Sequence, residues 1–297
     1  MSIHLSTLNF LLAINKKRKI SGKFLSIGKQ TVYIQVSKVF KTLKKYNLNI
    51  DEIKKRNFKV DINTRNKNDL NMEDESLINT FAKTDYNSLD KSFYENANEI
   101  FDLNSSKLSK KLINSYDFIY DGGTLDNVFS PASAIVSFSK MLKENGRILH
   151  SNMGSAWPGA YCSFSCEWFY SFYSNNNFKN VQVYLLVPKD GKWPNPNYFV
   201  YLFNPYFIRK KNYDPFIATK NLNISGSTII CFAEKGKSSS NNNLPIQSHY
   251  IEKKDIDWRK KNKIYKNKKI DKLKLKKISF KKRPFLSDHY KFLGILE

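Results

Sequence analysis

Glycines and aspartates follow several short apolar segments of this chain, and these residue types could bind a ligand or accept protons. They are Gly28, Asp90, Asp102, the run Asp121-Gly122-Gly123, and Asp126. Glycine allows a ligand to approach the backbone closely, and an ionised aspartate accepts hydrogen bonds from hydroxyl or amine groups. If the apolar segments are parallel strands, these turns meet outside the carboxyl edge of one sheet, where open α/β sheets bind ligands. The sequence therefore predicts a ligand site at that edge.

A candidate catalytic group is His150, at the end of the apolar segment 147–152. Together with Asp121 or Asp126, it could deprotonate a hydroxyl or amine group of a substrate. A lone histidine is more often structural, so both roles stay open. We name His150 and Asp126 as the candidate catalytic residues.

Aromatic and sulfur-containing residues follow this segment. Trp157, Tyr161 and Trp193 could form a wall against a sugar ring or a planar substrate, although core packing explains such clusters equally well. The three cysteines are unevenly spaced, with no third and fourth ligand near the closest two, so we predict reduced thiols and no metal site: Cys162, Cys166 and Cys231.

The elements that must position these residues alternate between strands and helices. Continuous apolar or β-branched runs predict seven strands, at 24–28, 85–90, 98–104, 116–121, 147–152, 181–187 and 227–234. Helical spacing predicts helices at 2–19, 32–46, 131–142 and 165–175. This alternation predicts an α/β fold with a doubly wound, mostly parallel, seven-stranded Rossmann-like sheet.

Changes in composition divide the chain. Residues 1–236 form the predicted domain, and residues 237–297 form a Lys-rich C-terminal extension. Within the domain, 47–79 is a polar insertion that we expect over the site. Residues 188–220 are rich in Pro and aromatic residues, which predicts an irregular loop or cap over the substrate cleft.

The segment 115–152 resembles the fourth strand, the following helix and the fifth strand of class I S-adenosylmethionine-dependent methyltransferases, with the phrase Leu142-Lys143-Glu144-Asn145-Gly146 before the last strand. The chain is also similar to a bacterial subgroup in which an aliphatic-Gly-basic-Gln phrase replaces the Gly-rich first loop. That phrase is Ile27-Gly28-Lys29-Gln30 here. Further counterparts are 89–97, 101–104 and 121–125, so the resemblance covers roughly 23–180.

The resemblance implies that S-adenosylmethionine is the cofactor and that residues of these phrases bind it. Gly28 with Gln30 would lie against the methionine part, together with Asp121, Gly122 and Gly123. Asp90 would accept hydrogen bonds from the ribose hydroxyls, and Asp102 with Leu103 would border the adenine. Asp90 or Asp102 could instead cap a turn or a helix.

The net charge of +24, from 50 Lys and Arg against 26 Asp and Glu, is typical of proteins that meet polyanions. About half of this charge lies in 237–297, where it could contact nucleic acid or a membrane surface. AT-rich coding bias would also explain abundant Lys, Asn and Ile. The apolar run 8–14 is far shorter than the roughly 20 residues that cross a bilayer, and basic residues follow it, so we expect a cytoplasmic protein.

These observations favour methyl transfer from S-adenosylmethionine to a small-molecule or saccharide acceptor. The alternative is a non-catalytic protein of the same fold that binds polyanions through its basic extension. A nicotinamide-dependent enzyme is a third reading, and the missing Gly-x-Gly-x-x-Gly phrase after the first strand counts against it.

Overall fold

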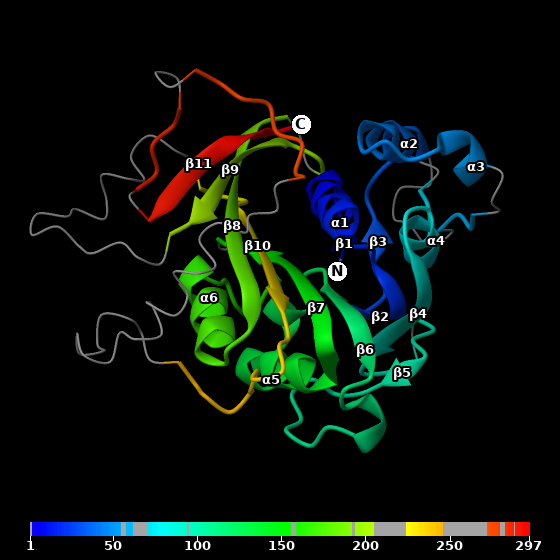
Figure 1. The fold of residues 1–297 in the computed structure, drawn as a ribbon, viewed down its shortest axis with the longest axis vertical. Helices are drawn as coiled ribbons and strands as arrows, with labels where there is room; N and C mark the ends of the chain where they lie inside the picture. The colour runs from blue at the N-terminus through cyan, green and yellow to red at the C-terminus, as the bar shows by residue number, and fades with distance from the viewer. Residues whose placement is uncertain are drawn as a thin grey trace, which may run out of the picture.

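A nine-stranded sheet organises the chain, with the order β11-β9-β8-β10-β7-β6-β2-β4-β5 (Figure 1). The computed structural model describes residues 2–54, 58–61, 71–93, 95–155, 159–191, 194–204, 224–245, 272–279, 283–287 and 289–297. The sheet is mixed, with antiparallel pairs at one end. The predicted sheet of seven mostly parallel strands therefore had too few strands and too few antiparallel pairs.

One half of the sheet is parallel and doubly wound. It contains β5 (Glu99–Ile100), β4 (Lys83–Asp90), β2 (Ser21–Ile27), β6 (Tyr116–Asp121) and β7 (Leu142–Met153), each parallel to its neighbour. The chain runs outward from β2 to β4 and β5, then returns to the other side of β2 to form β6 and β7. The winding direction therefore reverses between β2 and β6, which is where open α/β sheets bind ligands.

The other half of the sheet is antiparallel at each junction. Strand β10 (Thr228–Glu234) lies between β7 and β8 (Lys179–Asp190) and runs against both. Strand β9 (Asn197–Phe203) pairs antiparallel with β8, and β11 (Tyr290–Leu296) pairs antiparallel with β9. Figure 1 shows β11 in red beside β9, at the sheet edge opposite β5.

Strand β9 corrects the prediction that 188–220 is an irregular loop or cap. The Pro-rich part forms the turn between β8 and β9, while the following Tyr, Phe and Val residues pair with β8 because such side chains suit a pleated, half-buried surface. Residues 192–193 and 205–220 of this segment lie outside the described residues. The Lys-rich extension likewise ends in a strand, β11, whose last three residues are buried.

Helices cover both faces of the sheet. They are α1 (Leu5–Lys17), α2 (Val36–Lys45), α3 (Ile50–Lys54), α4 (Asp74–Asn79), α5 (Pro131–Met141) and α6 (Cys166–Asn175), with short 3-10 turns η1 (Lys110–Leu112) and η2 (Leu125–Asn127). The helices predicted at 2–19, 131–142 and 165–175 are confirmed with small shifts at their ends. The helix predicted at 32–46 begins only at Val36, because the chain before it forms a strand. This strand is β3 (Thr31–Val32), which pairs in parallel with β1 (Ser2–Ile3).

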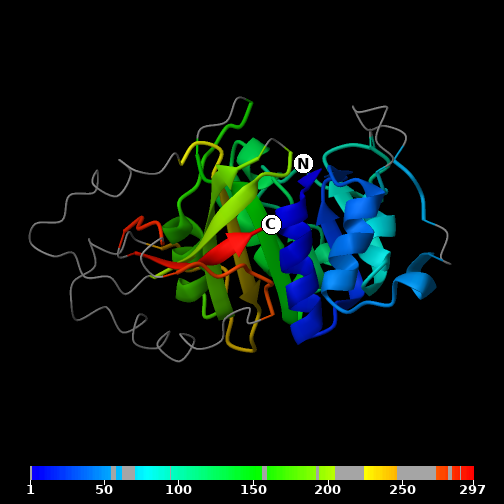
Figure 2. The same cartoon turned by 90° about the horizontal axis from the view of Figure 1, so that it is seen from above.

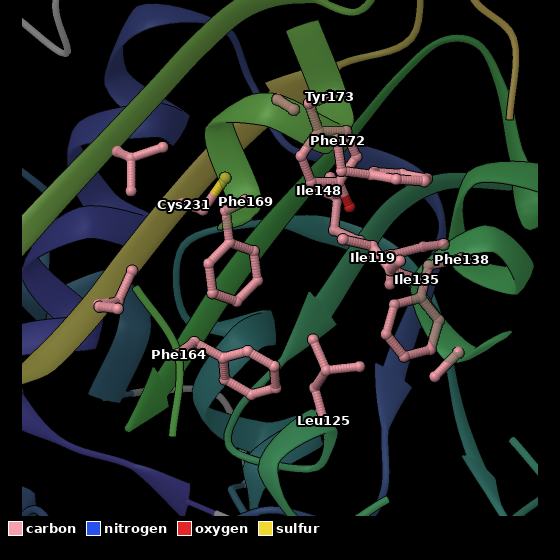
Figure 3. Close-up of a cluster of buried hydrophobic side chains, with 14 of the residues drawn as sticks. Ile119, Leu125, Ile135, Phe138, Ile148, Phe164, Phe169, Phe172, Tyr173 and Cys231 are labelled. Carbon is pink, nitrogen blue, oxygen red and sulfur yellow. The ribbon is translucent and has the colours of Figure 1, made fainter. Parts of the chain in front are cut away.

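Alternating side chains of the strands divide the core into two clusters. Phe24, Phe118 and Leu149 pack with α1, α2 and α4 on one face. Their chain neighbours Leu25, Ile119 and Ile148 pack with α5 and α6 on the other. Figure 2 shows α1 lying along the middle of the sheet, and Figure 3 shows the second cluster. A three-layer α/β arrangement results, which holds the carboxyl edge of the parallel strands in place.

No helix among the described residues is long and apolar enough to cross a membrane. Within the same residues, no three His, Cys, Asp or Glu side chains gather as metal ligands would. The three cysteines are unpaired with one another, and Cys166 and Cys231 are buried.

Candidate functional site

An open crevice of about 1860 Å³ lies at the carboxyl edge of the parallel strands. Its described lining comes from the turns after β2, β4 and β6, from the end of β7, and from the β8–β9 turn, with Ser2 and His4 before α1. Four residues predicted from the sequence lie in this lining: Gln30, Gly122, Gly123 and Asp126. The edge predicted to bind a ligand is therefore hollow, and it carries part of the predicted residue set. We call this cavity the carboxyl-edge crevice.

The turn after β2 is held by Gln30. Its side-chain amide donates to the carbonyl oxygens of Ile27 at 2.8 Å and Gly28 at 3.0 Å, so the side chain folds back over the strand end. Gly28 has a φ of +75°, which glycine adopts without strain, and its N–H donates to the Leu89 carbonyl at 2.7 Å. The Gln30 Oε1 atom is buried and has no hydrogen-bond partner among the described residues.

A charged network fixes the same turn from the side of α4. The carboxylate of Asp74, which is buried, accepts hydrogen bonds from the Gln30 backbone N–H and the Tyr86 hydroxyl, both at 2.7 Å. Lys29 forms ion pairs with Glu73 at 2.7 Å and Asp74 at 3.3 Å. Burial lowers the pKa of Lys29, but the attraction of Asp74 and Glu73 outweighs it, and the net shift is upward. The turn after β2 is therefore anchored from both sides.

The turn after β6 contains two glycines in different situations. A Cβ on Gly122 would lie 2.2 Å from Gln30 Oε1 and 2.6 Å from the Tyr120 hydroxyl, so any larger residue collides with its surroundings. Gly123 has a φ of +85°, and a Cβ there would have 3.6 Å to its nearest neighbour, Asp126 Oδ1. The first glycine is required for space, and the second for its backbone conformation.

Asp121 holds this turn from within the core. Its Oδ1 accepts hydrogen bonds from the backbone N–H groups of Thr124 at 3.0 Å and Leu125 at 3.2 Å, and its Oδ2 lies 2.7 Å from His150 Nδ1. The Nε2 atom of His150 lies 2.6 Å from the Tyr173 hydroxyl of α6. Asp121 and His150 have no exposed side-chain surface. Asp121 therefore shapes the turn while lying outside the crevice lining.

The burial of His150 does not fit the catalytic role predicted for it. Both ring nitrogens are engaged, and the ring is packed against Phe138, Phe169 and Tyr173. A proton acceptor must come within hydrogen-bond reach of the substrate, and a fully enclosed imidazole does not. The structural reading of this histidine, which the sequence left open, describes its surroundings better. In Figure 3, Phe138, Phe169 and Tyr173 appear within this buried cluster.

Asp126, in contrast, lies in the crevice wall. Only 4% of its surface is exposed, and its Oδ1 atom has no hydrogen-bond partner among the described residues. Burial and the neighbouring Asp121 raise the pKa of Asp126 to about 6, against smaller opposing effects of its own backbone N–H, the N-terminal ammonium and Asn152. Asn152 is itself buried, and its two side-chain polar atoms have no hydrogen-bond partner of ordinary geometry among the described residues. Sequence reasoning did not single out Asn152.

The aspartates after β4 and β5 accept hydrogen bonds from backbone N–H groups of their own turns. Asp90 Oδ1 accepts the N–H of Lys91 at 2.6 Å. Asp102 accepts the N–H of Asn104 at 2.9 Å, which lowers its pKa, and it pairs with Lys91 at 3.3 Å. Leu103 is buried in the core. Asp90, Asp102 and Leu103, like Gly28, are absent from the described crevice lining, so turn formation accounts for the two acids in this structure.

Glu95 is a crevice residue that the sequence did not reveal as a site residue. Burial, with the nearby charge of Asp90, raises its pKa. Because the charge of Asp90 acts on Glu95, Asp90 lies near the crevice wall even though it is not part of it. The hydroxyl-binding role of Asp90 stays a prediction.

The predicted aromatic wall is only partly described. Trp157 and Trp193 lie outside the described residues. Tyr161 is 70% exposed and packs edge to face on Phe129, which is 80% exposed. The Tyr161 N–H donates to the Asp126 carbonyl at 2.8 Å, so this exposed aromatic pair stands beside Asp126.

The N-terminal segment supplies crevice residues that sequence reasoning missed. His4 stacks on Tyr33 at 5.5 Å between ring centroids and bonds the Ser2 hydroxyl at 2.8 Å. Burial lowers the pKa of His4 to about 4, so it is neutral at neutral pH. A histidine just before an apolar helix was the available signal. Its significance depends on β1 pairing with β3, a contact between distant segments.

No protein-family model matches the chain, and no curated protein matches it either. Similar solved structures include the CMeT domain of the citrinin polyketide synthase, with 10% identity and a TM-score of 0.39, covering 78% of this chain and 52% of that one. A SAM-dependent methyltransferase from Archaeoglobus fulgidus has 8% identity and a TM-score of 0.38, with 76% and 94% covered. A Haemonchus contortus phosphoethanolamine N-methyltransferase 2 with bound S-adenosyl-L-methionine has 9% identity and a TM-score of 0.38, with 78% and 53% covered.

The chain thus spans about half the length of two of these three structures. TM-scores of this size lie below the level at which two chains share a fold. The fold and the candidate site therefore rest on the strand order, the contacts and the crevice described above.

Proposed function

We propose that the carboxyl-edge crevice binds S-adenosylmethionine and that the chain transfers a methyl group to an acceptor in the same crevice. The observation that carries this proposal is the position of the Gly122-Gly123 turn. It lines a large cavity where the winding of the sheet reverses, beside the unpartnered Gln30 Oε1. The doubly wound parallel half of the sheet is the arrangement that the sequence resemblance implies.

The polar groups of the crevice suit this cofactor, which is cationic at sulfur and carries amine and hydroxyl donors. Among the described lining residues, four are acids and two are lysines, although the whole chain carries +24: Asp61, Glu73, Glu95, Asp126, Lys29 and Lys59. Gln30 Oε1 and Asp126 Oδ1 are buried acceptors without partners in the described part of the chain. A buried acceptor without a partner costs free energy until a donor reaches it. The residues present therefore fit a cationic ligand rich in donors.

Individual roles follow from these positions. Gln30, Gly122 and Gly123 would hold the methionine end, and Asp90 with Glu95 would receive the ribose hydroxyls. When bound, the cofactor supplies a methyl group already activated by its positive sulfur. The chain's own contribution is to hold the two reactants together and to exclude water, and such positioning accounts for much of the acceleration in bimolecular reactions. The buried His150 and Asp121 would support the turn without touching the substrate. The acceptor is a small molecule or a saccharide.

Calorimetric titration with S-adenosylmethionine and S-adenosylhomocysteine tests the proposal. We expect micromolar affinity, about −8 kcal/mol, for the full chain. Asp90→Asn should weaken binding by about 1 to 3 kcal/mol, since it removes a charged acceptor. Asp85→Asn is the matched control, because Asp85 lies on the same strand β4 but toward the opposite edge of the sheet. Absence of binding to either ligand would refute the proposal.

A further inference from the structure

The uncompensated carboxylate of Asp126 indicates what kind of acceptor the crevice would take. Asp126 lines the crevice, is 4% exposed, and has an Oδ1 atom without a hydrogen-bond partner among the described residues. An ionised carboxylate that is removed from water and left without a counter-charge is costly, and proteins usually pair it. A ligand with a positive charge or an N–H donor would remove this cost.

The nearby charged groups do not supply that compensation. Asp121, on β6, exerts the largest effect of any charged group on Asp126, and its own carboxylate is bonded to His150 of β7 and to the η2 backbone. Asn152 of β7 is neutral. Lys29, a cation of the crevice lining, is held by Glu73 and Asp74 on the side of α4. No described cation forms an ion pair with Asp126, and the attraction of the N-terminal ammonium is smaller than the effects of burial and Asp121 that raise the pKa of Asp126.

Exposed aromatic side chains lie beside the backbone of Asp126, outside the described crevice lining. The exposed rings of Phe129 and Tyr161 pack on each other at 5.9 Å, and the Asp126 carbonyl oxygen binds the backbone N–H groups of Tyr161 and Cys162. Phe129 follows Asp126 by three residues. Aromatic faces attract cations, so exposed rings next to an acidic residue favour a positively charged ligand over a neutral one.

We infer that the acceptor is an amine, bound as a cation with its nitrogen at the Asp126 carboxylate. The carboxylate would take one proton from the ammonium group, which leaves a neutral nitrogen whose lone pair can form the new N–CH3 bond as the S–CH3 bond breaks. This inference rests on the proposed function, whose acceptor it specifies. The burial that raises the pKa of Asp126 to about 6 leaves the group mainly ionised at pH 7.5, where aliphatic amines are protonated. An alcohol of the same shape would offer one neutral donor and no charge.

Two probes of matched shape test the inference, namely 2-phenylethylamine and 2-phenylethanol. Their affinities for the full chain saturated with S-adenosylhomocysteine are measured by ligand-observed NMR titration at pH 7.5. We expect the amine to bind at least tenfold more tightly than the alcohol. Asp126→Asn, which keeps the shape and removes the charge, should lower the affinity for the amine to that for the alcohol. Asp61→Asn, the same change on another crevice wall, should leave most of the preference.

Each other outcome overturns the inference. Equal binding of the two probes, or binding of neither, would show that Asp126 does not select amines. If Asp61→Asn and Asp126→Asn lose the preference for the amine equally, that preference comes from the overall charge of the crevice. If Asp126→Asn chiefly weakens the binding of S-adenosylhomocysteine, Asp126 belongs to the cofactor site. Failure of the wild-type chain to bind S-adenosylhomocysteine would instead refute the proposed function, so the two failures are distinct.

Discussion

His150 Nδ1 lies 2.7 Å from Asp121 Oδ2 in a part of the core without solvent contact. An ionised carboxylate only accepts hydrogen bonds, so the Nδ1–H of His150 donates to Asp121, and the Tyr173 hydroxyl lies 2.6 Å from Nε2. Asp121 in turn accepts the Thr124 and Leu125 N–H groups. The pair thus connects helix α6 to the glycine turn of the crevice.

Replacing His150 should therefore reduce stability strongly. His150→Ala leaves the Asp121 carboxylate buried without its partner, and breaking a buried pair of this kind costs about 3 to 5 kcal/mol. Tyr173→Phe removes one neutral hydrogen bond and should cost about 1 kcal/mol. Urea unfolding followed by circular dichroism measures both free energies. A loss below 1 kcal/mol in His150→Ala would show that the pair does not support the fold.

The pH dependence of stability should reveal Asp126. Its pKa is raised from 3.8 to about 6 in the folded chain, so folding favours the protonated carboxyl. The resulting cost is absent below pH 4, grows as the pH rises to 6, and is complete above it. A pKa difference of this size corresponds to about 3 kcal/mol.

Asp126→Asn should accordingly be more stable than the wild type at pH 7.5, by up to about 3 kcal/mol, and equally stable at pH 4. Comparing the two proteins at each pH cancels the effect of His4, whose lowered pKa weakens folding as the pH falls below 6.5. Denaturant unfolding at both pH values measures the difference. If Asp126→Asn is less stable at pH 7.5, the carboxylate has a favourable partner.

The two glycines of the crevice turn should respond differently to alanine. Gly122→Ala places a Cβ 2.2 Å from Gln30 Oε1, so the anchored turn after β2 must move. We expect a loss of about 1 to 3 kcal/mol together with weaker S-adenosylhomocysteine binding. Gly123→Ala meets no close atom and should cost only the strain of its positive φ, about 1 kcal/mol. Melting curves and calorimetric titration separate the two effects, and an equal response of both variants would contradict the steric explanation.

Strand β11 should be necessary for full stability. It pairs with β9 and buries Ile295 and Leu296, and burying two such side chains contributes about 3 to 6 kcal/mol. A chain ending at residue 288 should melt earlier and self-associate, because β9 becomes an exposed sheet edge. Differential scanning calorimetry and sedimentation measure these changes. An unaltered melting temperature would show that β11 contributes little.

The pairing of β11 with β9 also limits how the prediction of polyanion binding can be tested. Deleting the whole extension 237–297 would remove β11 and destabilise the sheet together with the basic charge. Replacing Lys260, Lys261 and Lys263 with Gln keeps β11. If the extension binds polyanions, the affinity for a DNA duplex should fall in this variant and should weaken with added salt in the wild type. An affinity independent of salt would contradict contacts to phosphate.

Local sequence patterns determined the parallel half of the sheet and its carboxyl edge. The strand predicted at 116–121 coincides with β6, and those at 24–28 and 85–90 lie within one residue of β2 and β4 at their carboxyl ends. These strands are short and apolar, and turn residues bound them, so their hydrophobic pattern and the flanking turn residues identify them. The same patterns placed Gln30, Gly122, Gly123 and Asp126 at the edge that forms the crevice.

Tertiary contacts decided which of these groups face the crevice. His150 and Ser151 are neighbours on β7, but alternation directs His150 toward α6 and Ser151 toward Thr7 of α1. Nothing local to residue 150 distinguishes a buried ring from an accessible one, because its two partners are 29 and 23 residues away. Strand β9 and the crevice position of His4 likewise depend on pairing between distant segments. The sequence by itself therefore defined the strands and their turns, and the packing of helices on each face decided which side chains a ligand can reach.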